Sequence, residues 1–276
     1  MNTTIKTCVK LFDVTLRDGL QTNRRILSFG EKKNMLDSIM KKYNPPDIEA
    51  GSIVSDKILP QMKHSVELYH YGKKKYPNSN FYLLVPNYKY LEKGIHMDIH
   101  NYSFITSVSE SFQLKNTKMT LSETKEQLMK MTNILKKSNS NGLKKLYISC
   151  INECPIDGHI NNNHIVNEIL HYSNSYNFDN ICISDTCGTL TYKNLTNIIE
   201  KCLVNGLDPK ILTIHLHIDE NDKIKLKLFV DYLEKNGITT YDVSTLEDSG
   251  GCSVTIKEGN TRRNLTYHDL NVNEIN

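Results

Sequence analysis

The chain lacks the features that mark membrane and secreted proteins. No apolar run approaches the roughly 20 residues that a bilayer-spanning helix requires, and residues 1–10 are too short and polar for a signal peptide. The last four residues, NEIN, carry no peroxisomal address. The 7 cysteines include no Cys-x-x-Cys pair. We therefore expect free thiols in a reducing, cytoplasmic compartment, without disulfides or a thiolate zinc site.

An excess of charge of one sign is also missing. The chain has 34 Lys and Arg against 31 Asp and Glu, a net charge of +3, and its basic residues are scattered rather than clustered. This balance gives no reason to expect a nucleic acid or a membrane as partner, whereas a mildly basic surface suits an acidic, phosphate-bearing substrate. Because no repeat, linker or low-complexity segment interrupts the chain, residues 1–276 are expected to form a single domain.

What the chain does have is a regular alternation of apolar and lysine-rich segments. Apolar runs rich in Ile, Val, Leu and Tyr cover residues 8–16, 47–53, 80–86, 102–108, 145–150, 180–185, 211–217 and 240–246. Lysine-rich stretches with helical spacing lie between most of them, at 31–43, 122–137, 163–172, 193–204 and 223–235. Buried strands that alternate with helices predict a parallel sheet, and eight strands are the number that closes a (β/α)8 TIM barrel.

An open, doubly wound sheet is the alternative fold, but no Gly-x-Gly-x-x-Gly follows the first strand. The segment TLSE at 120–123 has the spacing of a capping box before a helix. Residues 87–101 leave room for only a short helix. Residues 247–276 include a long polar loop, so the C-terminal helical part of the barrel is expected to be short or missing.

Polar residues gather where the predicted strands end, which is the end where barrel enzymes place their chemistry. His215 and His217 are two residues apart on one strand, so both imidazoles point to the same side. With the carboxylate of Asp18 and an amide oxygen such as that of Asn264, they form a mixed nitrogen and oxygen donor set that favours Mg²⁺ or Mn²⁺ over structural Zn²⁺. From spacing alone, two core histidines bonded to the backbone are an equally good interpretation.

The same open choice applies to the other polar residues at these strand ends. Arg17 beside Asp18 is either a functional pair or a structural salt bridge, and Glu49 and Asp185 could be partners of lysines on the helices. Cys252 follows two glycines, which suggests a flexible loop that carries a thiol into a site, but a free cysteine is more often a small buried apolar residue.

The chain resembles the 3-hydroxy-3-methylglutaryl-CoA lyases, a family of metal-dependent barrel enzymes, from about residue 9 to about residue 270. The matching segments occur in the order found in that family: DVTLRDGLQ (13–21), IEAGSIVSDKILPQM (48–62), LVPNYKYLE (84–92), SVSESFQLKN (107–116), YISCINECPIDG (147–158), ISDTCG (183–188), HLH (215–217), SGGC (249–252) and NLTYHDL (264–270). The RDG and HxH motifs are shared with isopropylmalate and homocitrate synthases. The YISCINECPIDG and GGC segments are more particular to the lyases.

The resemblance implies roles for ten residues. The implied metal ligands are Asp18, His215, His217 and Asn264, with Asn260 as an alternative to Asn264. The implied catalytic residues are Arg17, which would neutralise a thioester enolate, Glu49 and Asp185 as acid/base and substrate-orienting carboxylates, and Cys252 as the cysteine of a mobile loop. Gln21 and Ser52 match positions that line the substrate pocket.

The resemblance therefore implies a lyase that cleaves hydroxymethylglutaryl-CoA, or a similar 3-hydroxy-acyl-CoA, to acetyl-CoA and acetoacetate by metal-assisted retro-Claisen chemistry. Two alternatives stay open: a related Claisen-condensing acyltransferase and a non-catalytic binding relative. Residues 253–263, SVTIKEGNTRR, are longer and more charged than the glycine-rich loop of the family. The later helices of the family, which usually cover the barrel and assist self-association, have no counterpart in this sequence. A homo-oligomer is a further expectation.

Overall fold

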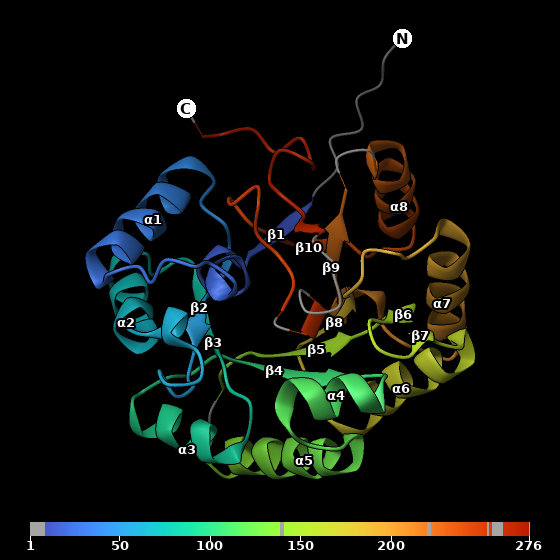
Figure 1. Ribbon diagram of the computed structural model, residues 1–276, viewed down its shortest axis with the longest axis horizontal. Coiled ribbons are helices and arrows are strands. Elements are labelled where there is room, and N and C mark those ends of the chain that lie inside the picture. Colours follow the sequence, from blue (N-terminus) through green and yellow to red (C-terminus); the bar gives the residue numbers. More distant parts are fainter. Residues whose placement is uncertain (1–8, 139–140, 220–221, 253, 256–261, 276) are drawn as a thin grey trace.

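The centre of the computed structural model, which describes residues 9–138, 141–219, 222–252, 254–255 and 262–275, is a ring of parallel strands (Figure 1). The strands are β1 Lys10–Asp13, β2 Asp47–Ser52, β3 Asn80–Leu84, β4 Tyr102–Ser107, β5 Lys144–Ser149, β8 Asn180–Asp185, β9 Leu212–Ile218 and β10 Thr240–Val243. Neighbouring strands pair in this order, and β10 pairs in parallel with both β9 and β1. This last pairing closes the sheet, so the predicted TIM barrel is confirmed.

Helices surround the ring of strands on its outside (Figure 1). They are α1 Phe29–Lys42, α2 Ser65–Lys75, α3 Tyr88–His96, α4 Glu110–Thr117, α5 Leu121–Lys137, α6 Asn162–Ser175, α7 Tyr192–Val204 and α8 Lys223–Lys235. The capping box predicted at 120–123 is confirmed, because the side chains of Thr120 and Glu123 each bond the other's backbone N–H at the start of α5. Within the described part of the chain, none of these helices is long and apolar enough to cross a membrane.

Alternate residues of each strand face the helices and the barrel axis, which is what allows the strands to be buried on both sides. On β5, Leu146 and Ile148 join the main apolar core, whereas Tyr147 and Ser149 face a pocket at the end of the barrel. Ser184 of β8 lies opposite His215 of β9 in the register, and both face the same pocket. The barrel interior is therefore polar near its carboxyl end, where the pocket opens.

Two helices and one hairpin were not evident in the sequence. The sequence of α2, SVELYHYGKKK, mixes aromatic residues with a glycine, so its helical periodicity is weak. Its Gly72 packs directly against Phe81, where an added Cβ would lie 2.3 Å from the ring. The second helix that was not evident is α4, and the hairpin is formed by β6 Glu153–Cys154 and β7 Gly158–His159.

The C-terminal segment returns to the barrel instead of adding a helix to its outer layer. Residues 244–252 and 262–275 contain no helix, and of the described tail only residues 254–255 are helical, which agrees with the prediction that the C-terminal helical part is short or missing. The strand β11, Arg263–Asn264, pairs antiparallel with the end of β9 and places Asn264 opposite His217. Tyr267 then donates a hydrogen bond of 2.7 Å to the buried Asp13 of β1, which anchors the segment.

Candidate metal centre and active site

Three predicted metal ligands converge at the carboxyl end of the barrel. The Nε2 atoms of His215 and His217 lie 3.3 Å apart, and the Nε2 atom of His215 lies 3.9 Å from Oδ2 of Asp18. One ligand atom from each of the three residues falls within 4.8 Å of the others, and all three residues are buried. The site thus joins strand β9 to the turn that follows β1.

Hydrogen bonds on the far side of each imidazole fix which nitrogen faces the site. Nδ1 of His217 lies 2.9 Å from the carbonyl oxygen of Thr186, and Nδ1 of His215 lies 3.2 Å from Oδ2 of Asp242. A carbonyl and a carboxylate can only accept, so both imidazoles carry their proton on Nδ1 when neutral. The two unprotonated Nε2 atoms, 3.3 Å apart, therefore direct their lone pairs at the same place, an arrangement that could hold a cation.

Asn264 offers a fourth donor atom, the oxygen of its amide. Its Nδ2 donates to Oδ2 of Asp18 at 2.9 Å, whereas its buried Oδ1 accepts no hydrogen bond from the described residues. A buried amide oxygen without a donor is costly unless it binds a cation or water. Asn264 thus fits the predicted ligand set on geometry, and Asn260 lies outside the described residues. Two histidine nitrogens with carboxylate and amide oxygens suit Mg²⁺ or Mn²⁺.

The turn after β1 brings Arg17 next to this donor set. Thr15–Gly19 forms a wide turn of π-helical type, and in it the guanidinium of Arg17 bonds both Asp18 and Glu49 of β2. Tyr147 of β5 donates to Oε2 of Glu49 at 3.0 Å, and its ring centroid lies 4.9 Å from Cζ of Arg17. Glu49 and Tyr147 thereby hold the guanidinium in one orientation.

Burial and charge oppose each other in this cluster. Burial alone would lower the pKa of Arg17, but Glu49 and Asp18 keep it above its ordinary value. Burial would raise the pKa of Asp18, but Arg17 and the two histidines hold it below its usual range. Burial, and next the charge of His215, lower the pKa of His217 to about 4. Neutral imidazole and ionised carboxylate are the forms that bind a metal ion.

A pocket of about 500 Å³, open at its mouth, surrounds these groups. Besides Arg17 and the metal-site residues Asp18, His215 and His217, its walls include Gln21, Tyr147, Ser149 and Cys252. The double glycine before Cys252 has a structural reason, since Gly250 has a φ of +148° and an added Cβ would lie 2.8 Å from the backbone nitrogen of Asn264. The backbone N–H of Gly251 donates to Nε2 of His217 at 3.4 Å.

Asp185 and Ser52 lie at the same end of the barrel but outside the pocket walls. The carboxylate of Asp185 accepts hydrogen bonds of 3.1 Å from the backbone N–H groups of Thr189 and Leu190, and burial raises the pKa of Asp185 to about 7. These contacts shape the loop whose Thr186 carbonyl orients His217. The N–H of Ser52 donates to Oγ of Ser65 at 3.2 Å. The catalytic role of Asp185 and the pocket role of Ser52 stay predictions.

Sequence reasoning missed four residues around the site: Tyr147, Thr186, Lys145 and Asp242. A signal was present for two of them. Lys145 and Asp242 are charged residues inside apolar strand sequences, KKLYIS and TYDV, where a buried strand ordinarily carries none. They form an ion pair across the barrel interior.

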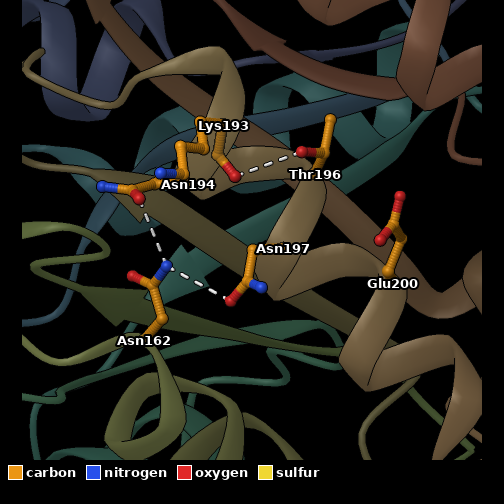
Figure 2. Close-up of a pocket in the computed structure, with 6 residues that line it drawn as sticks. All are labelled: Asn162, Lys193, Asn194, Thr196, Asn197 and Glu200. Carbon is orange, nitrogen blue, oxygen red and sulfur yellow. Dashed lines mark hydrogen bonds between the residues drawn. The ribbon is translucent and has the colours of Figure 1, made fainter.

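A second hollow, of about 530 Å³ with its open mouth, lies on the outside of the barrel between α6 and α7 (Figure 2). Figure 2 shows that its amide groups bond one another: Nδ2 of Asn162 donates to Oδ1 of Asn194 at 3.2 Å and to Oδ1 of Asn197 at 3.3 Å. Lys193 and Glu200 are the charged residues that line it. It contains none of the candidate site residues.

Comparison with known proteins agrees with the resemblance found in the sequence. Residues 8–221 match the family model described as HMGL-like. The chain is 27% identical over 245 residues to the mitochondrial hydroxymethylglutaryl-CoA lyase of Bos taurus, covering 88% of this chain and 72% of that protein. It is 27% identical over 247 residues to the 3-hydroxy-3-isohexenylglutaryl-CoA/hydroxy-methylglutaryl-CoA lyase of Pseudomonas aeruginosa, covering 88% and 78%.

Comparison with solved structures finds the same fold. The crystal structure of hydroxymethylglutaryl-CoA lyase from Pseudomonas aeruginosa matches with a TM-score of 0.80 at 24% identity, over 95% of this chain and 83% of that one. The range that matches the family model spans most of the chain, and Arg17, Asp18 and both histidines lie within it. The resemblance found in the sequence is confirmed, and the chain belongs to the HMGL-like family.

Proposed function

We propose that the protein is a carbon–carbon lyase that cleaves hydroxymethylglutaryl-CoA, or a similar 3-hydroxy-acyl-CoA, to acetyl-CoA and acetoacetate or the corresponding 3-oxo acid. The observation that carries the proposal is the convergence of two histidine Nε2 atoms, the Asp18 carboxylate and the orphan Oδ1 of Asn264 beside a buried arginine. The two curated relatives named above are lyases of this substrate class, which supports the same reaction type.

Asp18, His215, His217 and Asn264 would hold the divalent metal, Mg²⁺ or Mn²⁺. When bound, the ion supplies Lewis-acid polarisation of the hydroxyl and carboxylate oxygens of the substrate, which lowers the pKa of the hydroxyl. The chain's own contribution here is orientation, since the acceptors on Nδ1 of both histidines keep their Nε2 atoms directed at the site.

The cleavage step requires stabilisation of a developing negative charge. A base must take the hydroxyl proton, a role that the resemblance assigns to the carboxylates of Glu49 and Asp185. The hydroxyl oxygen then forms a ketone as the adjacent carbon–carbon bond breaks, and the electron pair of the broken bond becomes a thioester enolate. Arg17 lies in the pocket with its guanidinium fixed by Glu49 and Tyr147, so its charge is already in place when the enolate forms. Fixed charge of this kind typically lowers a barrier by about 3–4 kcal/mol.

The enolate carbon must then gain a proton to become the acetyl group. Cys252 lines the pocket beside the metal-site residues, and its thiol can donate that proton. The loop position is held locally, because the backbone N–H of Cys252 donates to Oγ1 of Thr255 at 2.8 Å. No redox group is required at any step.

The test is product analysis with purified protein that has been treated with chelator and reloaded with Mn²⁺. We expect acetyl-CoA and acetoacetate in equal amounts from hydroxymethylglutaryl-CoA, and no product in chelator. A parallel reaction offers acetyl-CoA with 2-oxo acids and follows release of free CoA. Release of CoA there, without cleavage of hydroxymethylglutaryl-CoA, would show the condensing alternative. A folded, metal-loaded protein that is inactive in both reactions would show a binding relative.

A further inference from the structure

Directly behind His215, the interior of the barrel contains an ion pair that the proposed reaction does not use. Nζ of Lys145 on β5 bonds Oδ1 of Asp242 on β10, and the side chains of both residues have 0% exposed surface. The other carboxylate oxygen of Asp242, Oδ2, lies 3.2 Å from Nδ1 of His215. The three residues form a continuous chain from the centre of the barrel to the metal site.

We propose that Lys145 and Asp242 are positioning residues that hold His215 in the tautomer whose Nε2 can bind the metal. This inference rests on the proposed metal site. Lys145 is a donor only, so the oxygen that it contacts must accept. The opposite oxygen of the carboxylate is then directed at Nδ1 of His215 and accepts its proton, which leaves the lone pair of Nε2 directed at Asp18 and His217.

A gain in folding stability does not explain why this ion pair is buried. Burying two charges is costly, and well-packed apolar residues in their place are often neutral or more stabilising. Apolar and weakly polar groups contact the pair directly: Nζ of Lys145 lies 3.4 Å from the ring centroid of Phe12, and Sγ of Cys182 lies 3.6 Å from Oδ2 of Asp242. What the pair supplies is a fixed acceptor for one imidazole N–H, as the Thr186 carbonyl does for His217.

The substitution Asp242→Asn tests this geometry because Lys145 dictates how the new amide lies. The amide oxygen must face the ammonium group, so the amide NH2 faces Nδ1 of His215 and requires an acceptor there. His215 is then forced into the tautomer that carries its proton on Nε2. We expect the affinity for Mn²⁺ to fall roughly 10- to 100-fold.

A second substitution should reverse the effect. In Lys145→Met/Asp242→Asn, nothing holds the amide oxygen, so the amide can turn and accept from Nδ1 of His215. We expect this double variant to regain most of the affinity for Mn²⁺. The double variant Lys145→Met/Asp242→Leu is its matched control, because it is equally uncharged but offers no acceptor, and we expect its affinity to stay low. If Asp242→Asn does not fold, comparison of these two uncharged double variants still tests whether an acceptor for Nδ1 of His215 is needed.

Two measurements read the outcome. Calorimetric titration of metal-free protein with Mn²⁺ gives the affinity, and long-range ¹H–¹⁵N correlation spectra of ¹⁵N-histidine-labelled, metal-free protein show which ring nitrogen carries the proton. Thermal melts check folding. Asp13→Asn is the control for a buried carboxylate that touches no metal-site residue, and it should leave the tautomer of His215 unchanged.

The inference is supported if the proton of His215 lies on Nδ1 in the wild type and in Lys145→Met/Asp242→Asn but not in Asp242→Asn. It is overturned if Asp242→Asn keeps the wild-type tautomer, or if the two neutral double variants have the same tautomer and affinity. A wild type that binds no Mn²⁺ would remove the proposed metal site, but the spectra of the metal-free proteins would still decide the role of Asp242.

Discussion

At the scale of single residues, Arg17 carries the charge on which the proposed chemistry depends. If it stabilises mainly the transition state, Arg17→Gln should lower kcat by roughly 10²–10⁴-fold with little change in KM. Arg17→Lys should restore little, because an ammonium group cannot contact Glu49, Asp18 and an enolate as a planar guanidinium does. Steady-state release of acetoacetate measures both variants. Near wild-type kcat in a well-folded Arg17→Gln protein would remove this role from Arg17.

The ligand set makes a second prediction at this scale. Asn264→Ala and His217→Ala should each bind Mn²⁺ much more weakly than the wild type, because each removes a donor atom from the site. Asn260→Ala is the matched control and should bind as the wild type does. Calorimetric titration decides the point, and loss of the metal in Asn260→Ala alone would transfer the ligand role to Asn260.

At the scale of elements, the loop between β8 and α7 depends on the buried carboxylate of Asp185, whose pKa is raised by burial from 3.8 to about 7. The folded protein then binds this proton more tightly than the unfolded chain does. The resulting stability is fully present below about pH 4 and is lost as pH rises through about 7, by roughly 1.4 kcal/mol for each pH unit inside this window.

The substitution Asp185→Asn removes the titration, so the difference in unfolding free energy between wild type and variant isolates it. We expect the wild type to lose stability relative to Asp185→Asn as the pH rises from 4 to 7, and the difference to be constant above pH 8. Urea unfolding in the presence of chelator measures it. A difference that does not change with pH would show that the carboxyl group has an ordinary pKa.

The loop that ends at Cys252 makes a separate prediction. Cys252→Ala should lower kcat while the affinity for Mn²⁺ stays at the wild-type value, because the thiol lines the pocket but is not among the proposed ligands. Cys202→Ala is a suitable control, since Cys202 is a buried residue of α7 and does not line the pocket. Equal kcat in wild type and Cys252→Ala would assign the final protonation to another donor.

The site also shows what local sequence can and cannot predict. The HLH motif predicted two imidazoles on one face because strand periodicity is local, and β9 confirms it. By contrast, Lys145 and Asp242 are 97 positions apart, and Tyr147 and Glu49 are 98 apart. These pairs meet only across a closed ring of strands, so no short window of sequence contains the partner that explains each residue.

At the scale of the whole molecule, barrel closure assembles the site from distant segments. The turn after β1 brings Arg17 and Asp18, β9 brings the histidines, and the antiparallel β11 brings Asn264. The sequence predicted the barrel because its alternation of strands and helices is regular. It did not predict β11, because a pair of residues after a charged loop has no periodicity to detect.

The most direct test of the central claim compares metal occupancy with catalysis in the same samples. Metal-free protein receives increasing Mn²⁺, bound metal is measured by calorimetry, and the initial rate of acetoacetate formation from hydroxymethylglutaryl-CoA is measured at each step. The account predicts that the rate rises in proportion to the filling of one site per chain and that Asn264→Ala shifts both curves together. Full activity in chelator, or a filled site in a folded but inactive wild-type protein, would contradict it.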